Sequence, residues 1–260
     1  MTVLPHITAT RFVTPLREGG SLPGLVEASD DGTYVVKFRG AGQGLKVLVA
    51  EVIVGEIGRA LGIAVPDLVT VGLSREIARF EADEEVQDLL TASVGLNLGM
   101  DYLPGAFGYD GSRPAPADVA DAIVWLDAFT ANVDRTWSNP NLLLWHDRVW
   151  AIDHGAALWF HHGWVRKAPS AKRFAAQPFD ASTHVLRDLT SDVGAFHGRA
   201  VDVLDEGVVR GVVDIVPDEW LESDEDGVHL PSPDAVREAY VEHLLARLAS
   251  PAAWLPGGRR

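Results

Sequence analysis

The sequence predicts an α+β protein in two parts, a small antiparallel sheet with one helix followed by a mainly helical region. Three observations support this fold class. Alternating β-branched and aromatic residues, separated by glycine-rich turns, fill residues 12–38 and are typical of antiparallel strands. From residue 45, apolar residues recur at helical spacing, and beyond residue 155 the pattern turns helical again. We expect the first part to occupy residues 1–100 and the second residues 101–260.

Composition limits the class of protein and its partners. The chain has 260 residues, 47% of them hydrophobic, which is ample for a packed core. The absence of cysteine excludes disulfides and thiolate metal sites and is compatible with the reducing cytoplasm, where we expect the protein. No signal-peptide pattern and no apolar run of roughly 18 residues occurs. The net charge of −15 repels phosphate polymers and anionic membranes, so we expect neither nucleic acid nor membrane as a partner.

The first part is predicted as three strands, a helix and a further strand. The strands are TRFVTPL, LVEA and TYVVKF, which glycine-containing turns connect. A glycine-rich loop, Gly40–Gly44, leads into the helix LKVLVAEVIVGEIGRALG, where Gly62 supplies the C-terminal stop. The chain then returns as a strand in IAVPDLVTVGL. Strands packed with one helix make a small α+β lobe.

The second part begins with a connection and a helix. Residues 74–116 contain an acidic stretch and a glycine-rich stretch, which we expect to form the crossover between the parts and an ordered loop. An apolar stripe over residues 118–132 predicts a helix that leads into an asparagine-rich loop. The strands NLLLW and RVWAID then form a hairpin with Asp153 at its far end. Near the C-terminus, Ser232 is the predicted N-cap of an amphipathic helix with Pro233 at its first position.

The asparagine-rich loop lies between two aspartates and carries the strongest chemical signal. In NVDRTWSNPN, Asp134 is followed five positions later by Asn139, and Asp153 ends the hairpin that comes next. Phosphoryl transfer needs one carboxylate to orient the attacking hydroxyl, and an amide oxygen and a second carboxylate to hold magnesium against the phosphates. Asp134 suits the first role, and Asn139 and Asp153 suit the second. Asn141 is the second choice for the amide, and a capping aspartate is the ordinary alternative for Asp134.

Residues upstream supply the other groups of such a site. Lys37 lies in the predicted strand TYVVKF, and Glu51 lies on the helix that follows. In protein kinases, a strand lysine contacts the α- and β-phosphates and a helix glutamate holds it in place. Glu56 competes with Glu51, and helical geometry alone does not separate them. In the first turn, glycines would let backbone amides approach a phosphate closely; the candidates are Gly19, Gly20 and Ser21.

These segments together resemble the HipA-like serine/threonine kinases, within the wider protein-kinase-like superfamily. The resemblance runs in order through YVVKF, AEVIVGEIGRALGIAVP, NVDRTWSN and WAIDHG, and it covers roughly residues 12–160. In this family the helix glutamate stands about one helix length before a Leu-Gly-hydrophobic-x-Val-Pro ending. The ending LGIAVP fits this pattern and selects Glu51 over Glu56.

The resemblance implies a fold, cofactors and roles for these residues. We expect the two-lobed protein-kinase-like fold, as a stand-alone kinase domain that uses ATP and Mg²⁺. By the resemblance, Lys37 contacts ATP, Asp134 is the catalytic carboxylate, and Asn139 and Asp153 are magnesium ligands. Glu51 holds Lys37.

The sequence also departs from the pattern of eukaryotic protein kinases. Asn132 and Val133 precede Asp134 in place of His-Arg, and the metal-binding motif is Asp-His-Gly in place of Asp-Phe-Gly. HipA-like and lipid-kinase-like enzymes tolerate both changes, which favours that branch. The loop offers Arg135 and Ser138 where many relatives carry a lysine.

Three functions follow as hypotheses. The first is an ATP- and magnesium-dependent kinase that phosphorylates a hydroxyl of protein serine or threonine, on an acceptor that the sequence does not identify. The second is a nucleotide-binding pseudokinase that acts as a protein-interaction module, and the third is a small-molecule or lipid-type kinase. A metal site at His154, His161 and His162 lacks an acidic partner at ligand spacing, and no G-x-S-x-G motif of a hydrolase occurs.

Overall fold

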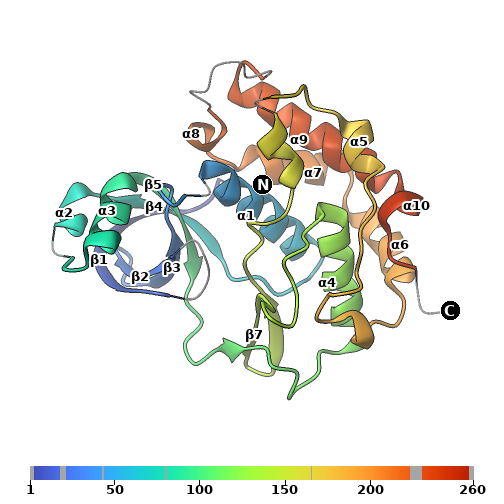
Figure 1. Cartoon of the computed structure of the whole chain (residues 1–260), viewed down its shortest axis with the longest axis horizontal. Coiled ribbons are helices and arrows are strands. Elements are labelled where there is room, and N and C mark those ends of the chain that lie inside the picture. The colour runs from blue at the N-terminus through green and yellow to red at the C-terminus, as the bar shows by residue number, and fades with distance from the viewer. Residues whose placement is uncertain are drawn as a thin grey trace. The chain divides into compact units, whose positions relative to one another are not determined.

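The protein is α+β, as predicted, with strands in its N-terminal part and mainly helices in its C-terminal part (Figure 1). The structure is a computed structural model that describes residues 3–17, 22–42, 44–79, 81–164, 166–222 and 230–257. Its contacts divide the chain into two compact units. The first unit comprises Thr2–Leu48 and Pro66–Pro104, and the second comprises Val49–Val65 and Gly105–Arg260.

Five strands of the first unit close into a barrel in the order β1-β2-β3-β5-β4. They are β1 (His6–Pro15), β2 (Gly24–Ala28), β3 (Thr33–Lys37), β4 (Leu68–Leu73) and β5 (Gly95–Asp101). All neighbours pair antiparallel except β1 and β4, whose parallel pairing closes the barrel. The prediction of a purely antiparallel sheet was therefore wrong for the pair β1 and β4. The N-terminal half of β1 precedes the predicted strand, and β5 lies in the predicted crossover.

Branched aliphatic residues at alternate strand positions fill the core of this unit. Val36 and Val71 are fully buried there, as the alternation of side chains along a strand requires. Gly99 on β5 lets the strands pack closely, since a β-carbon at this position would lie 2.6 Å from Val71 Cγ2. Two helices, α2 (Arg75–Ala78) and α3 (Glu84–Ala92), add apolar residues to the same core.

The predicted helix after the glycine-rich loop is α1 (Leu45–Ala60), most of which belongs to the second unit. Gly62 ends it as predicted: its φ is +80°, and the amide that follows it donates to Gly58 O at 2.9 Å. A left-handed glycine with such a returning bond is a common helix end. A β-carbon at Gly58 would lie 3.2 Å from Leu126 Cδ2, so α1 packs closely on α4 (Ala117–Thr130).

A small antiparallel sheet in the second unit contains the predicted hairpin. β7 (Leu142–Trp145) pairs with β8 (Arg148–Ala151), and β6 (Phe107–Gly108) lies on the other side of β7. Between β7 and β8, His146 and Asp147 have φ of +47° and +58°. Two successive left-handed residues form the usual two-residue hairpin turn. The predicted hairpin is therefore confirmed, and it ends just before Asp153.

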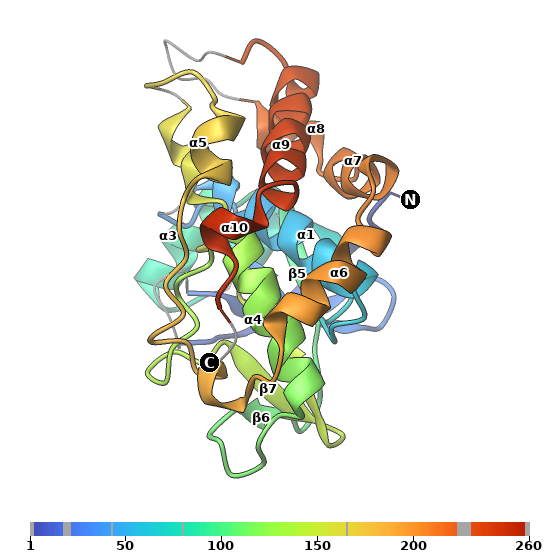
Figure 2. The same ribbon diagram turned by 90° about the vertical axis from the view of Figure 1, so that its right-hand side faces the viewer.

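Helices form the rest of the second unit. α4 is buried at every position from Ala120 to Thr130. α9 (Pro233–Leu248) begins as predicted at Ser232, whose hydroxyl accepts a hydrogen bond from Ala235 N–H at 3.3 Å. It contacts α4, α5, α7 and α8 (Figure 2). The remaining helices are η1 (Trp159–Gly163), α5 (Ala171–Ala175), η2 (Arg187–Leu189), α6 (Val193–Val203), α7 (Glu206–Asp214), α8 (Asp218–Leu221) and α10 (Pro251–Trp254). None of the helices in the described ranges has the length and apolar character needed to cross a membrane.

Candidate functional site

The loop that carries Asp134 begins where α4 ends. Ala131 adopts a left-handed backbone with φ +56°, and Asn132 N–H donates back to Asp127 O at 2.8 Å. These two features stop the helix and turn the chain. Val133 and Asp134 follow as exposed residues. The helix predicted to lead into this loop is thus confirmed.

The structure brings Asp134 and Asn139 together. Asn139 Nδ2 donates to Asp134 Oδ2 at 2.9 Å, across a tight turn in which Thr136 and Asn139 exchange two backbone hydrogen bonds of 3.1 Å. Asn141, the second choice for a metal-binding amide, donates through Nδ2 to the backbone oxygen of Asp134 at 2.9 Å. The Asn141 side chain therefore stabilises the Asp134 loop through a backbone contact. Among the described residues, no donor contacts Asn139 Oδ1, so this oxygen is available to a ligand.

Asp153 lies on the segment that follows β8. Ile152 N–H donates to Asn141 O at 3.0 Å, which joins this segment to the end of the Asp134 loop. Asp153 is half-buried and has φ +54°. A left-handed backbone is uncommon outside glycine, although aspartate and asparagine adopt it more often than other residues. Residues in such conformations cluster at functional sites, where the surrounding structure enforces them.

Lys37 and Glu51 are both deeply buried. Lys37 ends β3, opposite Leu98 of β5, and is 4% exposed; Glu51 lies on α1 and is 1% exposed. Glu56, the competitor, is more exposed and forms an ion pair with Arg59 on the same helix, with Nε and Oε1 3.5 Å apart. Charged side chains are rarely so buried unless they are paired. Lys37 belongs to the first unit and Glu51 to the second, and their mutual pairing stays a prediction.

The predicted phosphate-covering residues Gly19, Gly20 and Ser21 lie outside the described residues. They belong to the segment between β1 and β2. At its base, Leu16 N–H donates to Pro23 O at 2.7 Å. The role of the three residues stays a prediction.

Comparison with protein families identifies the chain. Residues 9–256 match the model of the HipA-like kinases. The chain belongs to the HipA-like kinase family. The predicted resemblance is confirmed, and it extends beyond residue 160 through the helices of the second unit. The protein is therefore a kinase. No match was found among curated protein sequences.

Solved structures similar to this HipA-like kinase are themselves kinases. The crystal structure of a Helicobacter pylori proinflammatory kinase, CtkA, has a TM-score of 0.54 at 12% sequence identity, covering 95% of this chain and 94% of that chain. This likeness shows a shared fold. The Golgi casein kinase has a TM-score of 0.42 at 11% identity, covering 96% of this chain and 72% of its own. Its structure with Mn/ADP bound has a TM-score of 0.44 at 12% identity, covering 95% and 73%. At TM-scores below 0.5, the latter two add no support to the fold.

The oxygen donors of this HipA-like kinase fit a magnesium ion that also binds phosphates. No group of three or more histidine, aspartate and glutamate side chains gathers as a metal site within the described residues. Magnesium needs few protein ligands when water and phosphate oxygens complete its octahedron. The available Asn139 Oδ1 and the Asp153 carboxylate are ligands of this hard-oxygen kind. His161, by contrast, contacts Tyr240 Oη through Nδ1 at 2.7 Å, inside the helical region.

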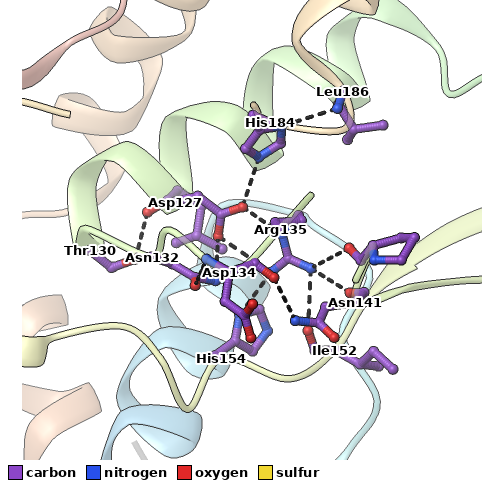
Figure 3. Close-up of polar contacts among 12 residues, drawn as sticks. Asp127, Thr130, Asn132, Asp134, Arg135, Asn141, Ile152, His154, His184 and Leu186 are labelled. Carbon is purple, nitrogen blue, oxygen red and sulfur yellow. Dashed lines mark hydrogen bonds and ion pairs between the residues drawn. The ribbon is translucent and has the colours of Figure 1, made fainter. Parts of the chain in front are cut away.

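A buried polar network behind the Asp134 loop was not predicted. Asp127, on α4, lies 2.5 Å from Arg135 Nε and 2.9 Å from His184 Nε2 (Figure 3). Burial alone raises the pKa of Asp127, but the charge of Arg135 and the hydrogen bond from His184 outweigh it, so the pKa lies below its usual value. A signal existed for Asp127, an acidic residue inside the apolar run AIVWLDAFT. No local pattern marked His184.

Arg135 and Ser138 are the residues that the loop offers where many relatives carry a lysine, and they have different environments. The guanidinium of Arg135 is buried and directed toward Asp127. Ser138 Oγ contacts Thr136 Oγ1 at 2.9 Å at the tip of the turn. Trp137, 61% exposed, stacks on Tyr109 with ring centroids 6.3 Å apart. The outer face of the loop therefore presents Trp137 and hydroxyls.

Proposed function

We propose that this HipA-like kinase transfers the γ-phosphoryl group of ATP, with magnesium, to a serine or threonine hydroxyl of a protein. The observation that carries the proposal is the 2.9 Å hydrogen bond from Asn139 to Asp134, in a loop whose end is joined by backbone to the Asp153 segment. A hydroxyl-orienting carboxylate and two oxygen donors for magnesium therefore lie on one connected piece of the chain. Phosphoryl transfer requires this combination.

The proposed roles of the loop residues follow from their donors and acceptors. Asp134 keeps one carboxylate oxygen for the acceptor hydroxyl, because Asn139 Nδ2 occupies the other. Asp134 orients the hydroxyl and accepts its proton late in the transfer. Asn139 Oδ1 and the Asp153 carboxylate hold the magnesium ion, which neutralises charge on the β- and γ-phosphates when it is bound. Fixed groups of this kind stabilise the transition state without reorganisation.

The first unit is proposed as the nucleotide-binding lobe of a two-lobed protein-kinase-like fold. Lys37, buried at the end of β3, would contact the α- and β-phosphates, and Glu51 would hold it. Gly19, Gly20 and Ser21 would cover the phosphates with backbone amides. We propose that the acceptor is a protein in the cytoplasm. We propose neither nucleic acid nor membrane as a partner, because the net charge of −15 repels polyanions.

Two substitutions test the proposal. Asp134→Asn is expected to lower phosphate transfer about 10²- to 10⁴-fold while ATP binding stays, because the proposed role of Asp134 is to bind the acceptor hydroxyl and not the nucleotide or the metal. Asp153→Asn is expected to weaken both transfer and magnesium-dependent ATP binding. Asp147→Asn, at the exposed hairpin turn, is the matched control and should change neither. Labelled phosphate transfer to lysate proteins and ATP titration measure the two quantities. Undiminished transfer by Asp134→Asn would contradict the assignment.

A second candidate function is a nucleotide-binding pseudokinase. It is favoured by the inward direction of Arg135, which leaves no basic side chain between Asp134 and Asn139 on the outer face of the loop. A pseudokinase would bind ATP and transfer no phosphate. The third hypothesis, a small-molecule kinase, predicts label in the small-molecule fraction of the lysate and none in protein.

A further inference from the structure

Arg135 lies next to the proposed catalytic carboxylate, but its side chain has the opposite environment. Asp134 is exposed, whereas Arg135 is 1% exposed. Figure 3 shows the guanidinium between Asp127 of α4 on one side and Asn141 and Ile152 on the other. The same side chain thus reaches three segments that are separate in sequence.

On the α4 side, Arg135 and Asp127 form a buried two-point ion pair. Arg135 Nε lies 2.5 Å from Asp127 Oδ2, and Nη2 lies 3.3 Å from Oδ1. Asn132 Nδ2 also donates to Asp127 Oδ1, at 3.0 Å. Paired contacts between a guanidinium and a carboxylate fix the orientation of both groups as well as their separation.

His184 completes the anchor of this ion pair. Leu186 N–H donates to His184 Nδ1 at 3.1 Å, so that nitrogen carries no proton. The proton of the ring is then on Nε2, which donates to Asp127 Oδ2 at 2.9 Å. The same segment also holds the loop by its backbone, since Val185 N–H donates to Arg135 O at 3.0 Å. Both oxygens of Asp127 are therefore satisfied by donors that do not reach the solvent.

On the loop side, Arg135 joins the two segments that carry the proposed catalytic carboxylates. Nη1 donates to the backbone oxygen of Asn141 and to that of Ile152, the latter at 3.3 Å. Nη2 contacts His154 Nδ1 at 3.4 Å. Ile152 and His154 are the two neighbours of Asp153 in the sequence. One side chain therefore holds the end of the Asp134 loop and both residues that flank Asp153.

We propose that Arg135 is a positioning residue that fixes Asp134 and Asp153 relative to each other, with Asp127 and His184 as its anchor. The proposal rests on the proposed function and deepens it. Arg135 touches neither nucleotide nor acceptor in this role. It acts through the backbone beside the two aspartates, because a displacement of about 1 Å in a reacting group lowers the rate about 10²-fold.

The contacts require an arginine rather than a positive charge alone. A guanidinium offers five N–H donors in a rigid plane, whereas a lysine ammonium is a compact charge with three donors on a flexible stem. A lysine at position 135 would keep a cation beside Asp127 but would not span to the carbonyls of Asn141 and Ile152. Arg135→Lys therefore tests the contacts to the two carbonyls while the positive charge beside Asp127 is kept.

Arg247 provides a matched control inside the same unit. It is 0% exposed and donates to the backbone oxygens of Phe174, Gln177 and Ala128 at 2.6, 2.8 and 2.7 Å. Within the described part of the chain, it contacts neither the loop of Asp134 nor the segment of Asp153. Arg247→Lys removes a comparable set of buried carbonyl contacts, so it reports what a purely structural arginine does.

The experiment combines kinetics with hydrogen exchange of the protein without ligand. Transfer is measured from ATP and magnesium to a library of serine- and threonine-containing peptides, and exchange is followed in peptides covering residues 132–145 and 148–158. Arg135→Lys is expected to lower kcat about 10²-fold with little change in the KM for ATP, and to speed exchange in both peptides. Arg247→Lys is expected to leave both peptides protected and kcat at the wild-type level.

Several results would overturn the proposal. A wild-type kcat and wild-type exchange in Arg135→Lys would exclude the positioning role. Equal effects of Arg135→Lys and Arg247→Lys would show that Arg135 has only a structural role, like Arg247. If Arg135→Lys does not fold, His184→Ala loosens the anchor alone, and a fall in kcat of about 10-fold is expected; an unchanged kcat and exchange pattern contradicts the proposal. If the wild-type protein transfers no phosphate, the proposed function fails, and the exchange comparison still decides whether Arg135 orders the two segments.

Discussion

At the scale of single residues, Asp127 is a buried charge of α4 that pairs with Arg135 and His184 behind the Asp134 loop. We expect Asp127→Asn to lower the free energy of unfolding by about 3–5 kcal/mol, because it leaves the buried guanidinium of Arg135 without its counter-charge. Asp121 is the matched control on the same helix. It is 4% exposed, and it accepts hydrogen bonds from the N–H groups of Ser191 and Asp192 and from the Ser191 hydroxyl. Asp121→Asn should lose about 1–3 kcal/mol. Urea unfolding measures both, and equal losses would contradict the role of Arg135.

Asp127 also makes the free energy of unfolding depend on pH in the acid range. The pKa of Asp127 is lowered in the folded state, since the charge of Arg135 and the bond from His184 outweigh the effect of burial. The unfolded chain, with an aspartate pKa of about 3.9, therefore binds the proton first as the pH falls. The stability that Asp127 contributes is present above about pH 4 and is lost below it. The difference in unfolding free energy between wild type and Asp127→Asn should be constant at neutral pH and shrink below about pH 4. Parallel curves down to pH 3 would contradict this expectation.

At the scale of elements, the position of Trp137 on the Asp134 loop depends on a glycine before α4. Gly111 has φ +78°, and a β-carbon there would lie 2.9 Å from Trp137 Cη2. Gly105 has the same φ, but no atom lies within 4 Å of such a β-carbon. Both alanine variants should lose about 1–2 kcal/mol from the left-handed backbone. Gly111→Ala should lose more and should also lower kcat, because Trp137 must move at the tip of the loop. Equal stability and kcat in the two variants would show that the ring contact has no influence.

Elements with short-range signals were predicted well. The end of α1 at Gly62, the Ser232 cap of α9 and the β7–β8 hairpin each depend on a few neighbouring residues. β5 was missed because GLNLGMD contains two glycines and an asparagine, which are uncommon inside strands, although Leu96, Leu98 and Met100 alternate with them. Its Gly99 is required by Val71 on the neighbouring strand, which is a tertiary reason that the local sequence does not show.

The candidate site likewise has a part with a local sequence signal and a part that depends on tertiary contacts. Asp134, Asn139 and Asp153 could be predicted as site residues because they lie at fixed spacing around one loop and one hairpin. The structure places Asp134 and Asn139 in contact. The buried support behind them comes from α4 and from the segment of His184, which is distant in the sequence. The contacts of Arg135 were not predicted, because its position in the motif does not indicate on which side of the loop its side chain lies.

At the scale of the whole molecule, each of the two compact units contains segments that are not contiguous in the sequence. The parallel pairing of β1 with β4 closes the first unit, and α1 from Val49 onward belongs to the second. Both depend on contacts between segments far apart in the chain, for which the strand and helix patterns gave no signal. As a consequence of the second of these features, Lys37 and Glu51 lie in different units.

The proposed site predicts that nucleotide and magnesium together stabilise the folded protein. A ligand that binds only the folded state adds about 2.7 kcal/mol at a concentration 100 times its Kd. We expect ATP with magnesium to raise the midpoint of thermal unfolding more than ATP alone, because in the proposed site Asn139 Oδ1 and Asp153 would bind the phosphates through the ion. Asp153→Asn should lose the magnesium-dependent part of the shift, and the exposed Asp147→Asn should keep it. Equal shifts with and without magnesium in the wild-type protein would contradict the proposed metal ligands and leave nucleotide binding by the first unit as the explanation of the shift.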